Sequence, residues 1–159
     1  MSGIIIIGAG QAGSSLAIKL KTLGYEGTVT LIGDEPVAPY QRPPLSKKYL
    51  LGEMTLDRLY LRPPEFYAKQ GIDLRINTAV DAINIAEKTI QIGSKSLGYE
   101  QLALTTGSKP RLLPSRIGGK LNGIFSVRSL ADVNAMKSAF DKGGPVSYTH
   151  LTLPTTPYV

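Results

Sequence analysis

The chain has 159 residues, of which 42% are hydrophobic, with a formal net charge of +6, no Cys and a single His. This composition is that of one globular domain, and the lack of Cys excludes disulfides, thiolate nucleophiles and iron–sulfur ligation by the chain itself. A His-based metal site or triad is excluded as well, so any redox chemistry has to belong to a bound cofactor.

The start of the chain carries no targeting or membrane signal. Its longest aliphatic run, Ile4–Ile7, is far shorter than the roughly 20 residues that cross a bilayer, and no basic segment with a cleavage site precedes it. Lys and Arg are scattered, with few aromatic residues among them, which disfavours a nucleic-acid surface. We therefore expect a cytoplasmic protein with no membrane and no nucleic-acid partner; its oligomeric state stays open.

The N-terminal region has the pattern of a strand, a helix and a second strand. Ile4–Ile7 is a continuous β-branched run, which is typical of a parallel strand buried on both faces. Apolar residues at helical spacing follow, and Gly24 stands where a helix would end. Val29–Ile32 is a second apolar run. Together they predict one right-handed βαβ unit.

The turn between the first strand and the helix reads G-x-G-x-x-G. In such a turn the first Gly makes the tight bend, the second lets the backbone approach a pyrophosphate, and the third lets the helix pack close to the sheet. The helix N-terminus then faces the phosphates. The expected ligand-binding residues are Gly8, Ala9, Gly10, Gln11, Ala12 and Gly13.

Asp34 ends the second strand, about 20 residues after the Gly-rich turn, which is the spacing of a ribose-binding acid. Its carboxylate can accept both hydroxyls of an adenosine ribose and would repel a 2′-phosphate, which disfavours NADP in this site. A Gly-rich turn with a coincidental acid in an unrelated α/β domain is the competing explanation, and the strand–turn–helix context argues against it. FAD and NAD share this fingerprint, so other residues have to distinguish them.

The rest of the chain is predicted to form short elements. Ser46 is expected to cap a short helix that ends before Gly52, and further helices are expected over residues 65–70 and 132–141. The predicted strands cover residues 72–76, 79–85, 89–92 and 101–105. The middle two are expected to pair as a hairpin. The fold class is therefore α/β, a Rossmann-like domain with an inserted small β-hairpin or β-meander.

Several segments carry a resemblance to a known family. They are residues 31–36 (L-I-G-D-E-P), 40–47 (Y-Q-R-P-P-L-S-K), 59–62 (L-Y-L-R), 66–67 (F-Y), 71–72 (G-I) and 104–111 (L-T-T-G-S-K-P-R). Up to about Pro145 the chain resembles FAD-dependent NAD(P)H:ferredoxin reductases of the type that serves putidaredoxin and rhodocoxin. The resemblance implies that residues 1–145 are the N-terminal part of an incomplete FAD-binding domain of the two-dinucleotide flavoprotein type, with Glu35 beside Asp34 in the cofactor site.

The resemblance also implies roles for residues that patterns alone leave as surface groups. Lys47 would lie beside the isoalloxazine ring, where a cation stabilises negative charge on the reduced flavin, and Arg42 beside the adenosine and pyrophosphate. The Val80 backbone would contact the adenine. The turn at Thr106 and Gly107 would pass the pyrophosphate, and Arg128 would contact the flavin. Without the family match, Lys47 reads as a solvated helix start and Arg128 as a surface charge.

In that family NAD(P)H reduces FAD, and the flavin passes single electrons to an iron–sulfur ferredoxin, so no catalytic side chain and no metal ligand is assigned in this chain. Three alternatives stay open. The first is a related flavoprotein: a rubredoxin reductase, a nitrite-reductase flavin subunit or an apoptosis-inducing-factor-like protein. The second is a non-catalytic dinucleotide-binding module, and the third is an NAD-only dehydrogenase. The choice of NADH or NADPH and of the ferredoxin is open too.

The last residues depart from the family pattern. Where a strand and a second G-x-G-x-x-G are expected after Pro145, residues 146–156 read V-S-Y-T-H-L-T-L-P-T-T. This text can be back-translated as GTC TCT TAT ACA CAT CTG and onward, which matches a transposase-type sequencing adapter. We expect residues 146–159 to be a non-native tail. The chain alone is expected to retain FAD weakly or not at all and to turn over no NAD(P)H.

Overall fold

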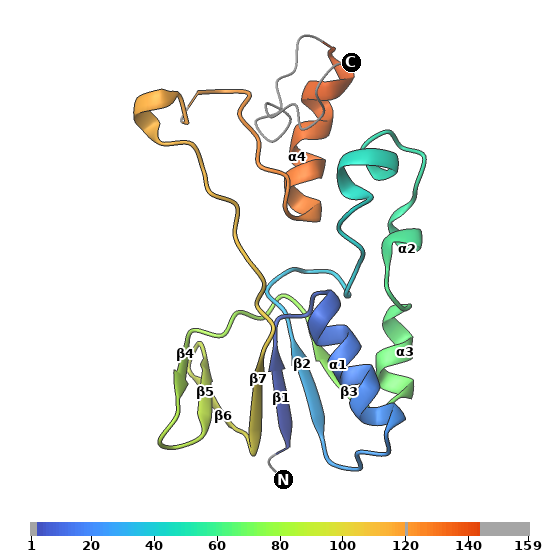
Figure 1. The fold of residues 1–159 in the computed structure, drawn as a ribbon, viewed down its shortest axis with the longest axis vertical. Coiled ribbons are helices and arrows are strands. Elements are labelled where there is room, and N and C mark those ends of the chain that lie inside the picture. Colours follow the sequence, from blue (N-terminus) through green and yellow to red (C-terminus); the bar gives the residue numbers. More distant parts are fainter. Residues whose placement is uncertain (1–2, 120, 144–159) are drawn as a thin grey trace, which may run out of the picture.

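The computed structural model describes residues 3–119 and 121–143, and the predicted tail over residues 146–159 lies outside them. Within these ranges the chain forms a parallel sheet of order β3-β2-β1-β7 and an antiparallel sheet of order β4-β5-β6 (Figure 1). The strands are β1 (Ile4–Ile7), β2 (Val29–Ile32), β3 (Ile72–Arg75), β4 (Ala82–Asn84), β5 (Thr89–Ile92), β6 (Lys95–Gly98) and β7 (Gln101–Leu104). The helical segments are α1 (Gln11–Thr22), η1 (Leu45–Tyr49), α2 (Leu56–Leu59), α3 (Pro64–Lys69), η2 (Ser115–Ile117) and α4 (Leu130–Asp141). The predicted α/β class is confirmed.

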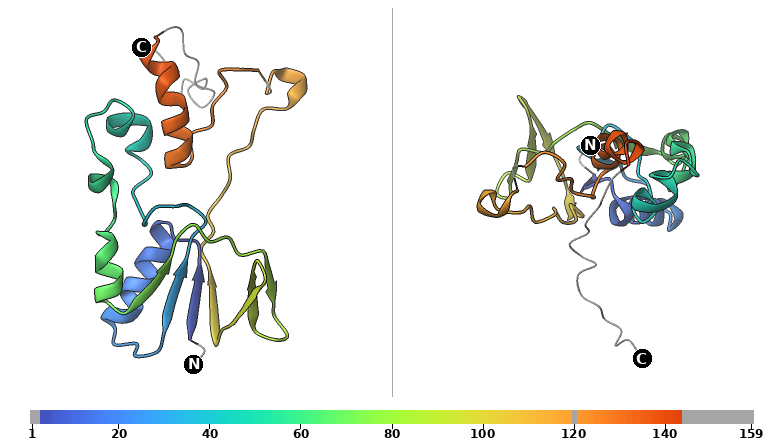
Figure 2. Two further views of the ribbon diagram at one scale, coloured as in Figure 1. Left: turned by 180° about the vertical axis from the view of Figure 1, so that it is seen from behind. Right: turned by 90° about the horizontal axis from the view of Figure 1, so that it is seen from above.

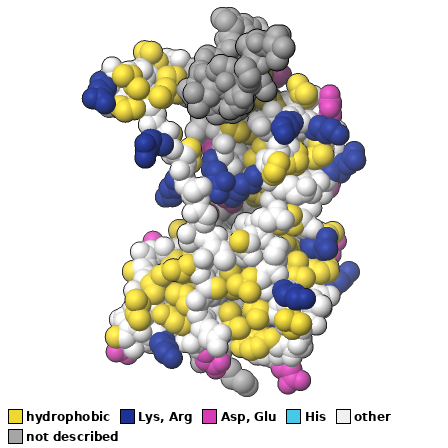
Figure 3. Space-filling model, viewed as in Figure 1, with side chains coloured by type: hydrophobic (Ala, Val, Ile, Leu, Met, Phe, Trp, Pro, Cys, Tyr) yellow, Lys and Arg dark blue, Asp and Glu magenta, His cyan; other side chains and the backbone are white. Residues whose placement is uncertain are grey.

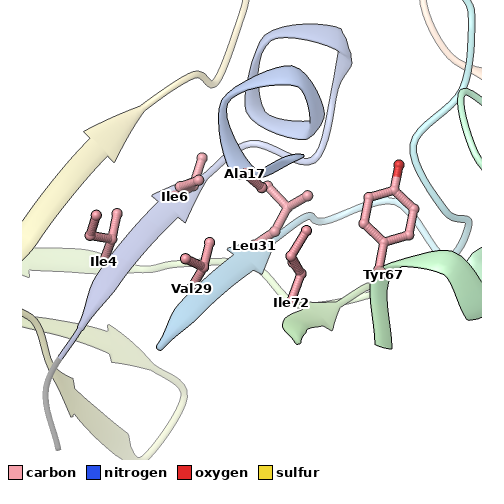
Figure 4. Close-up of a cluster of buried hydrophobic side chains, with 7 residues drawn as sticks. All are labelled: Ile4, Ile6, Ala17, Val29, Leu31, Tyr67 and Ile72. Carbon is pink, nitrogen blue, oxygen red and sulfur yellow. The ribbon is translucent and has the colours of Figure 1, made fainter. Parts of the chain in front are cut away.

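Strand β1 lies between two layers, as its unbroken apolar run predicts. Ile4 and Ile6 belong to the cluster under α1 and α3 (Figure 4). Ile5 and Ile7 face the other way and pack with Ile90 of β5. Because successive side chains of a strand point to opposite faces, four consecutive buried isoleucines join a helical layer, the parallel sheet and the antiparallel sheet.

The βαβ unit forms as predicted. β1 pairs in parallel with β2, and α1 crosses between them. Gly24 takes a left-handed φ of +84° just after the last helical turn, the conformation that ends many helices at glycine. Within α1, the buried Ser14 hydroxyl is hydrogen-bonded to the Tyr67 hydroxyl of α3 at 2.8 Å, which ties the two helices of this layer together.

The antiparallel sheet is the expected insertion, with one strand more than the sequence indicated. The β4–β5 hairpin turns through Lys88, which has a φ of +49°. β4 covers only residues 82–84 of the predicted 79–85. Just before it, the Asp81 amide donates to the Gln91 carbonyl and the Asp81 carboxylate accepts from the Gly93 amide. β6 was not predicted, because its sequence, K-S-L-G, has little of the alternation of apolar and polar residues that is typical of a strand.

Segments η1, α2 and α4 form a second helical cluster beyond the carboxyl ends of the parallel strands, which Figure 2 shows from behind and from above. Its buried residues are Tyr40, Leu45, Leu50, Leu59, Leu130, Val133 and Met136. The expected cap at Ser46 is wrong. The segment starts at Leu45 with Pro44 as its cap and without a side-chain cap, and the amides of Lys47 and Tyr49 both donate to the Pro44 carbonyl, at 3.0 and 3.1 Å. α4 begins two residues earlier than predicted, because Ser129 forms a capping box with its third helical residue.

None of the helices in the described ranges is long and apolar enough to cross a membrane. On the face shown in Figure 3, Lys and Arg side chains are scattered, and one group of them lies close to the narrow middle, between the sheet and the second helical cluster. This narrow middle is where the candidate site lies.

Candidate functional site

A cavity of about 310 Å³ opens at the carboxyl ends of β1, β2 and β7. In open α/β sheets, ligands bind at this end of the strands. Its lining residues are Gly8, Ala9, Gly10, Gln11, Ala12, Gly33, Asp34, Glu35, Val37, Tyr40, Arg42, Pro43, Thr105, Thr106, Gly107 and Arg128. Every residue assigned to the site from sequence lines it, apart from Gly13, Lys47 and Val80.

Two glycines of the turn are required by the chain's own packing. Gly8 has a φ of +109°, and a Cβ there would lie 2.3 Å from the Thr105 carbonyl oxygen. A Cβ on Gly13 would lie 2.1 Å from the Gly8 carbonyl oxygen, so α1 packs against the turn as closely as predicted. The Thr105 hydroxyl donates to the Gly8 carbonyl at 2.9 Å, which fastens the turn to the end of β7.

Gly10 is different, because nothing in the described chain requires a glycine there. Its φ of −90° suits any residue, and a Cβ would meet no atom within 4 Å. Gly10 is also the cap of α1, and among residues 3–119 and 121–143 no side-chain cap bonds to the start of that helix. The space before it is therefore open cavity, lined by N–H groups at the positive end of a twelve-residue helix.

Asp34 stands on the rim of this cavity, immediately after β2. A Cβ on the preceding Gly33 would lie 2.5 Å from the Ala9 Cβ, so the two loops are in contact. The Asp34 side chain is exposed and has no ion-pair partner in residues 3–119 or 121–143. Its carboxylate is free to accept hydrogen bonds from a ligand at the rim.

A charged network crosses the other side of the cavity. Arg42 donates to Glu35 Oε1 at 2.5 Å and to the Arg128 carbonyl at 2.7 Å. The Tyr40 hydroxyl donates to Glu35 Oε2 at 2.6 Å and accepts from Arg42 at 3.2 Å and from the Leu130 amide at 2.9 Å. Burial raises the pKa of Tyr40 above its usual range, and the hydrogen bond to the Glu35 carboxylate raises it further. The hydroxyl thus stays neutral at physiological pH.

Arg128 places a second guanidinium group at the turn after β7. Gly107 has a φ of +69°, and a Cβ there would lie 2.8 Å from Arg128 Nη2. The Asp132 carboxylate accepts from the amides of Arg128 and Ser129 at 3.0 and 2.8 Å, which fixes the start of α4. Two cations from segments far apart in sequence, Arg42 and Arg128, therefore meet at one cavity.

Three predicted site residues lie elsewhere. Gly13 is buried behind the turn and supports it. Lys47 is exposed in η1, where its φ of −129° and ψ of −113° interrupt the helix, and it does not line the cavity. Val80 packs beside the cluster that contains Ile5 and Ile90. Contact with a cofactor remains a prediction for these residues, as it does for the predicted residues that line the cavity.

Sequence reasoning missed five lining residues, namely Gly33, Val37, Tyr40, Pro43 and Thr105. Tyr40 carried a usable signal, because it lies inside the quoted Y-Q-R-P-P segment and a buried tyrosine hydroxyl needs a partner. Thr105 precedes the quoted Thr106–Gly107 turn, but only the fold shows its bond to Gly8.

Comparison with known proteins agrees with this geometry. Residues 2–148 match the family model described as pyridine nucleotide-disulphide oxidoreductase. The chain is 42% identical over 137 residues to putidaredoxin reductase of Pseudomonas putida, covering 84% of this chain and 32% of that protein. It is 39% identical to rhodocoxin reductase of Rhodococcus erythropolis, with coverages of 86% and 32%.

Two solved structures of reductases are similar to this chain as well. The covalent putidaredoxin reductase–putidaredoxin complex is similar with a TM-score of 0.80 and 40% identity, over 87% of this chain and 34% of that one. The ferredoxin reductase for the CYP199A2 system of Rhodopseudomonas palustris is similar with a TM-score of 0.81 and 32% identity, over 89% and 35%. The chain thus spans about one third of the length of these relatives. By the match over residues 2–148 and the cavity at its Gly-rich turn, the chain belongs to the pyridine nucleotide-disulphide oxidoreductase family.

Proposed function

We propose that residues 1–145 are the N-terminal part of the FAD-binding domain of a cytoplasmic NAD(P)H:ferredoxin oxidoreductase, and that residues 146–159 are a non-native tail. The observation that carries the proposal is the open space at Gly10, bordered by free helix amides, with Asp34 on one side and two arginines on the other. FAD, when bound, accepts a hydride from NAD(P)H and returns electrons one at a time. Related proteins named as ferredoxin reductases support this assignment.

The Gly-rich turn fits a pyrophosphate. The Gly8 amide is used inside the fold, where it donates to the Ile32 carbonyl at 2.8 Å. The next residues, Ala9–Ala12, line the cavity at the start of α1, and the open space at Gly10 leaves room for an oxygen-rich group to approach their backbone. Asp34 would accept the ribose hydroxyls at the rim. Because a carboxylate repels a 2′-phosphate, this half of the site favours an adenosine without one.

The opposite wall fits the middle of the same ligand. Arg42 and Arg128 would bind the phosphates, and the Thr106–Gly107 turn would let the chain pass close to them. Glu35 offsets part of the Arg42 charge through their ion pair, so Arg128 supplies the less compensated cation. Lys47 and Val80 would reach the isoalloxazine ring and the adenine, respectively, from outside the cavity described above.

A rubredoxin-linked enzyme is the second candidate. The rubredoxin-NAD(+) reductase of Pseudomonas putida is 36% identical over 84% of this chain. The ferredoxin reductase subunit of a Sphingobium O-demethylase is 44% identical over 83%, and this higher identity favours ferredoxin. With the complete protein, faster reduction of a two-iron ferredoxin than of rubredoxin would support the proposal, and the reverse would replace it.

Binding to the 159-residue chain itself tests the cofactor assignment. We expect ADP to bind in a calorimetric titration, and AMP to bind more tightly than adenosine 2′,5′-bisphosphate, which differs from AMP only in the 2′-phosphate that Asp34 disfavours. We expect FAD to be lost during purification, since the chain spans a third of its relatives. Absence of ADP binding would contradict the site, and a yellow, flavin-saturated chain with diaphorase activity would contradict the proposed incompleteness.

A further inference from the structure

A buried tyrosine hydroxyl joins separate segments beside the cavity. Tyr40 is 4% exposed, and its ring packs in the second helical cluster with Leu45 and Leu130. Its oxygen accepts from Leu130 and Arg42 and donates to Glu35. A phenol has one proton and two lone pairs, so all of its hydrogen-bonding capacity is used by these partners.

Two contacts of this network fix the main chain around Arg128. The Leu130 amide bonds to Tyr40, and the Arg128 carbonyl accepts from Arg42 at 2.7 Å. These bonds reach across 86 to 90 positions of sequence. The start of α4 is therefore tied to the loop after β2, and not only to its own capping box.

The position of that main chain decides where the Arg128 guanidinium lies. Arg128 Nη2 is held over the Gly107 turn, near enough that a Cβ at Gly107 would be 2.8 Å away. Both residues line the cavity. A shift of the backbone at residues 128–130 would move this cation away from the space before Gly10.

We propose that Tyr40 is a positioning residue whose hydroxyl holds Arg42 and the backbone of Arg128 so that both guanidinium groups face the phosphates of the bound dinucleotide. This inference rests on the proposed function, since it presumes that a dinucleotide fills the cavity. The raised pKa of Tyr40 is consistent with it, because a neutral hydroxyl keeps both its donor and its acceptors.

The test compares two probes that differ only in phosphate. The 159-residue chain, Tyr40→Phe and Tyr49→Phe are each titrated with ADP and with adenosine. Tyr49 is the matched control. Its hydroxyl also bonds to α4, to Asn134 Oδ1 at a distance of 2.9 Å, but Tyr49 does not line the cavity. We expect Tyr40→Phe to weaken ADP binding about tenfold and adenosine binding less than about twofold. Tyr49→Phe should leave the ratio of the two affinities unchanged.

A second variant keeps the inference testable if Tyr40→Phe folds poorly. Glu35→Ala leaves the tyrosine ring in its cluster and removes the carboxylate that holds Tyr40 and Arg42. If Glu35 helps to position Arg42, ADP should bind more weakly to Glu35→Ala. If Glu35 only neutralises Arg42, ADP should bind more tightly, because Arg42 would lose its competing anion. Tighter ADP binding in Glu35→Ala, or equal losses for ADP and adenosine in Tyr40→Phe, would overturn the inference alone. Failure of the unmodified chain to bind ADP would overturn the proposed function with it.

Discussion

Substitution of Gly10 by alanine separates a glycine that the ligand needs from glycines that the fold needs. The added methyl group would meet no atom of the described chain within 4 Å and would project into the cavity. Alanine restricts the unfolded chain more than glycine does, which is worth about 0.4–1 kcal/mol of stability. Alanine is also the poorer helix cap, by a similar amount of about 0.5–1 kcal/mol. The two effects nearly cancel, so we expect the stability of Gly10→Ala to stay within about 0.5 kcal/mol of the original.

The effect on binding should be large. A methyl group in the space before the α1 amides keeps the phosphates from approaching them, and the loss of one charge-assisted hydrogen bond there costs about 1.5–3 kcal/mol, or at least about tenfold in affinity for ADP. Gly13→Ala should instead lower the stability of the fold. Its Cβ would lie 2.1 Å from the Gly8 carbonyl oxygen, and such overpacking costs roughly 1–3 kcal/mol of stability.

Urea unfolding followed by circular dichroism, together with calorimetric ADP titration, measures both quantities on the same samples. Gly98→Ala is the control, because Gly98 lies on β6, far from the cavity, and a Cβ there would have only the Lys88 carbonyl oxygen at 4.0 Å. ADP affinity that survives in Gly10→Ala would refute the assignment of the open space to phosphate. Destabilisation of Gly10→Ala as large as that of Gly13→Ala would refute the claim that the space is empty of protein.

Four further outcomes are expected. Asp34→Asn should weaken ADP binding and reduce the preference for AMP over adenosine 2′,5′-bisphosphate, as competition titration would show; an unchanged preference would exclude Asp34 as the discriminating group. Tyr67→Phe leaves the buried Ser14 hydroxyl without its 2.8 Å partner and should cost about 1–3 kcal/mol, most of which Ser14→Ala in the same chain should restore, as urea unfolding would measure. Because the folded-state pKa of Tyr40 is raised, stability is fully present below the unfolded pKa of about 10 and should fall above it, by about 1.4 kcal/mol per pH unit for this group; alkaline unfolding curves of Tyr40→Phe should therefore decline less steeply, and equal slopes would show that Tyr40 does not contribute. Ser129→Ala removes the α4 capping box and should cost about 1 kcal/mol; no change in the unfolding midpoint would show that the cap is not formed in solution.

The βαβ unit was predictable because its signals are local. The isoleucine run, the Gly-rich turn and Gly24 each act within a few residues of themselves, and each formed where expected. The residues of the site were assigned partly from this local pattern and partly from a family resemblance, and the structure gathers most of them at one cavity. Their role in cofactor binding still depends on experiment.

What the sequence could not show depends on contacts between distant segments. The helical segment begins at Leu45 and not after a Ser46 cap, because the Pro44 carbonyl accepts from the Lys47 and Tyr49 amides and Leu45 is buried in the second helical cluster. The bond from Arg42 to the Arg128 carbonyl joins residues 86 positions apart. The spacing of residues in the sequence does not predict this hydrogen bond, because the two residues meet only when α4 packs against the earlier helical segments.

The stretch between β7 and α4 has a consequence for how the chain can be divided. Residues 106–117 are all exposed, including Leu112 at 70% and Ile117 at 61%, so this long stretch without a strand is an accessible target for limited proteolysis. α4 is held by its own cluster and by the Tyr40 and Arg42 bonds, none of which uses the exposed stretch. A nick there should leave two peptides that remain associated and separate only under denaturing conditions. The covalent connection would then be dispensable for holding α4 in place, and the chain could be reassembled from two unequal fragments.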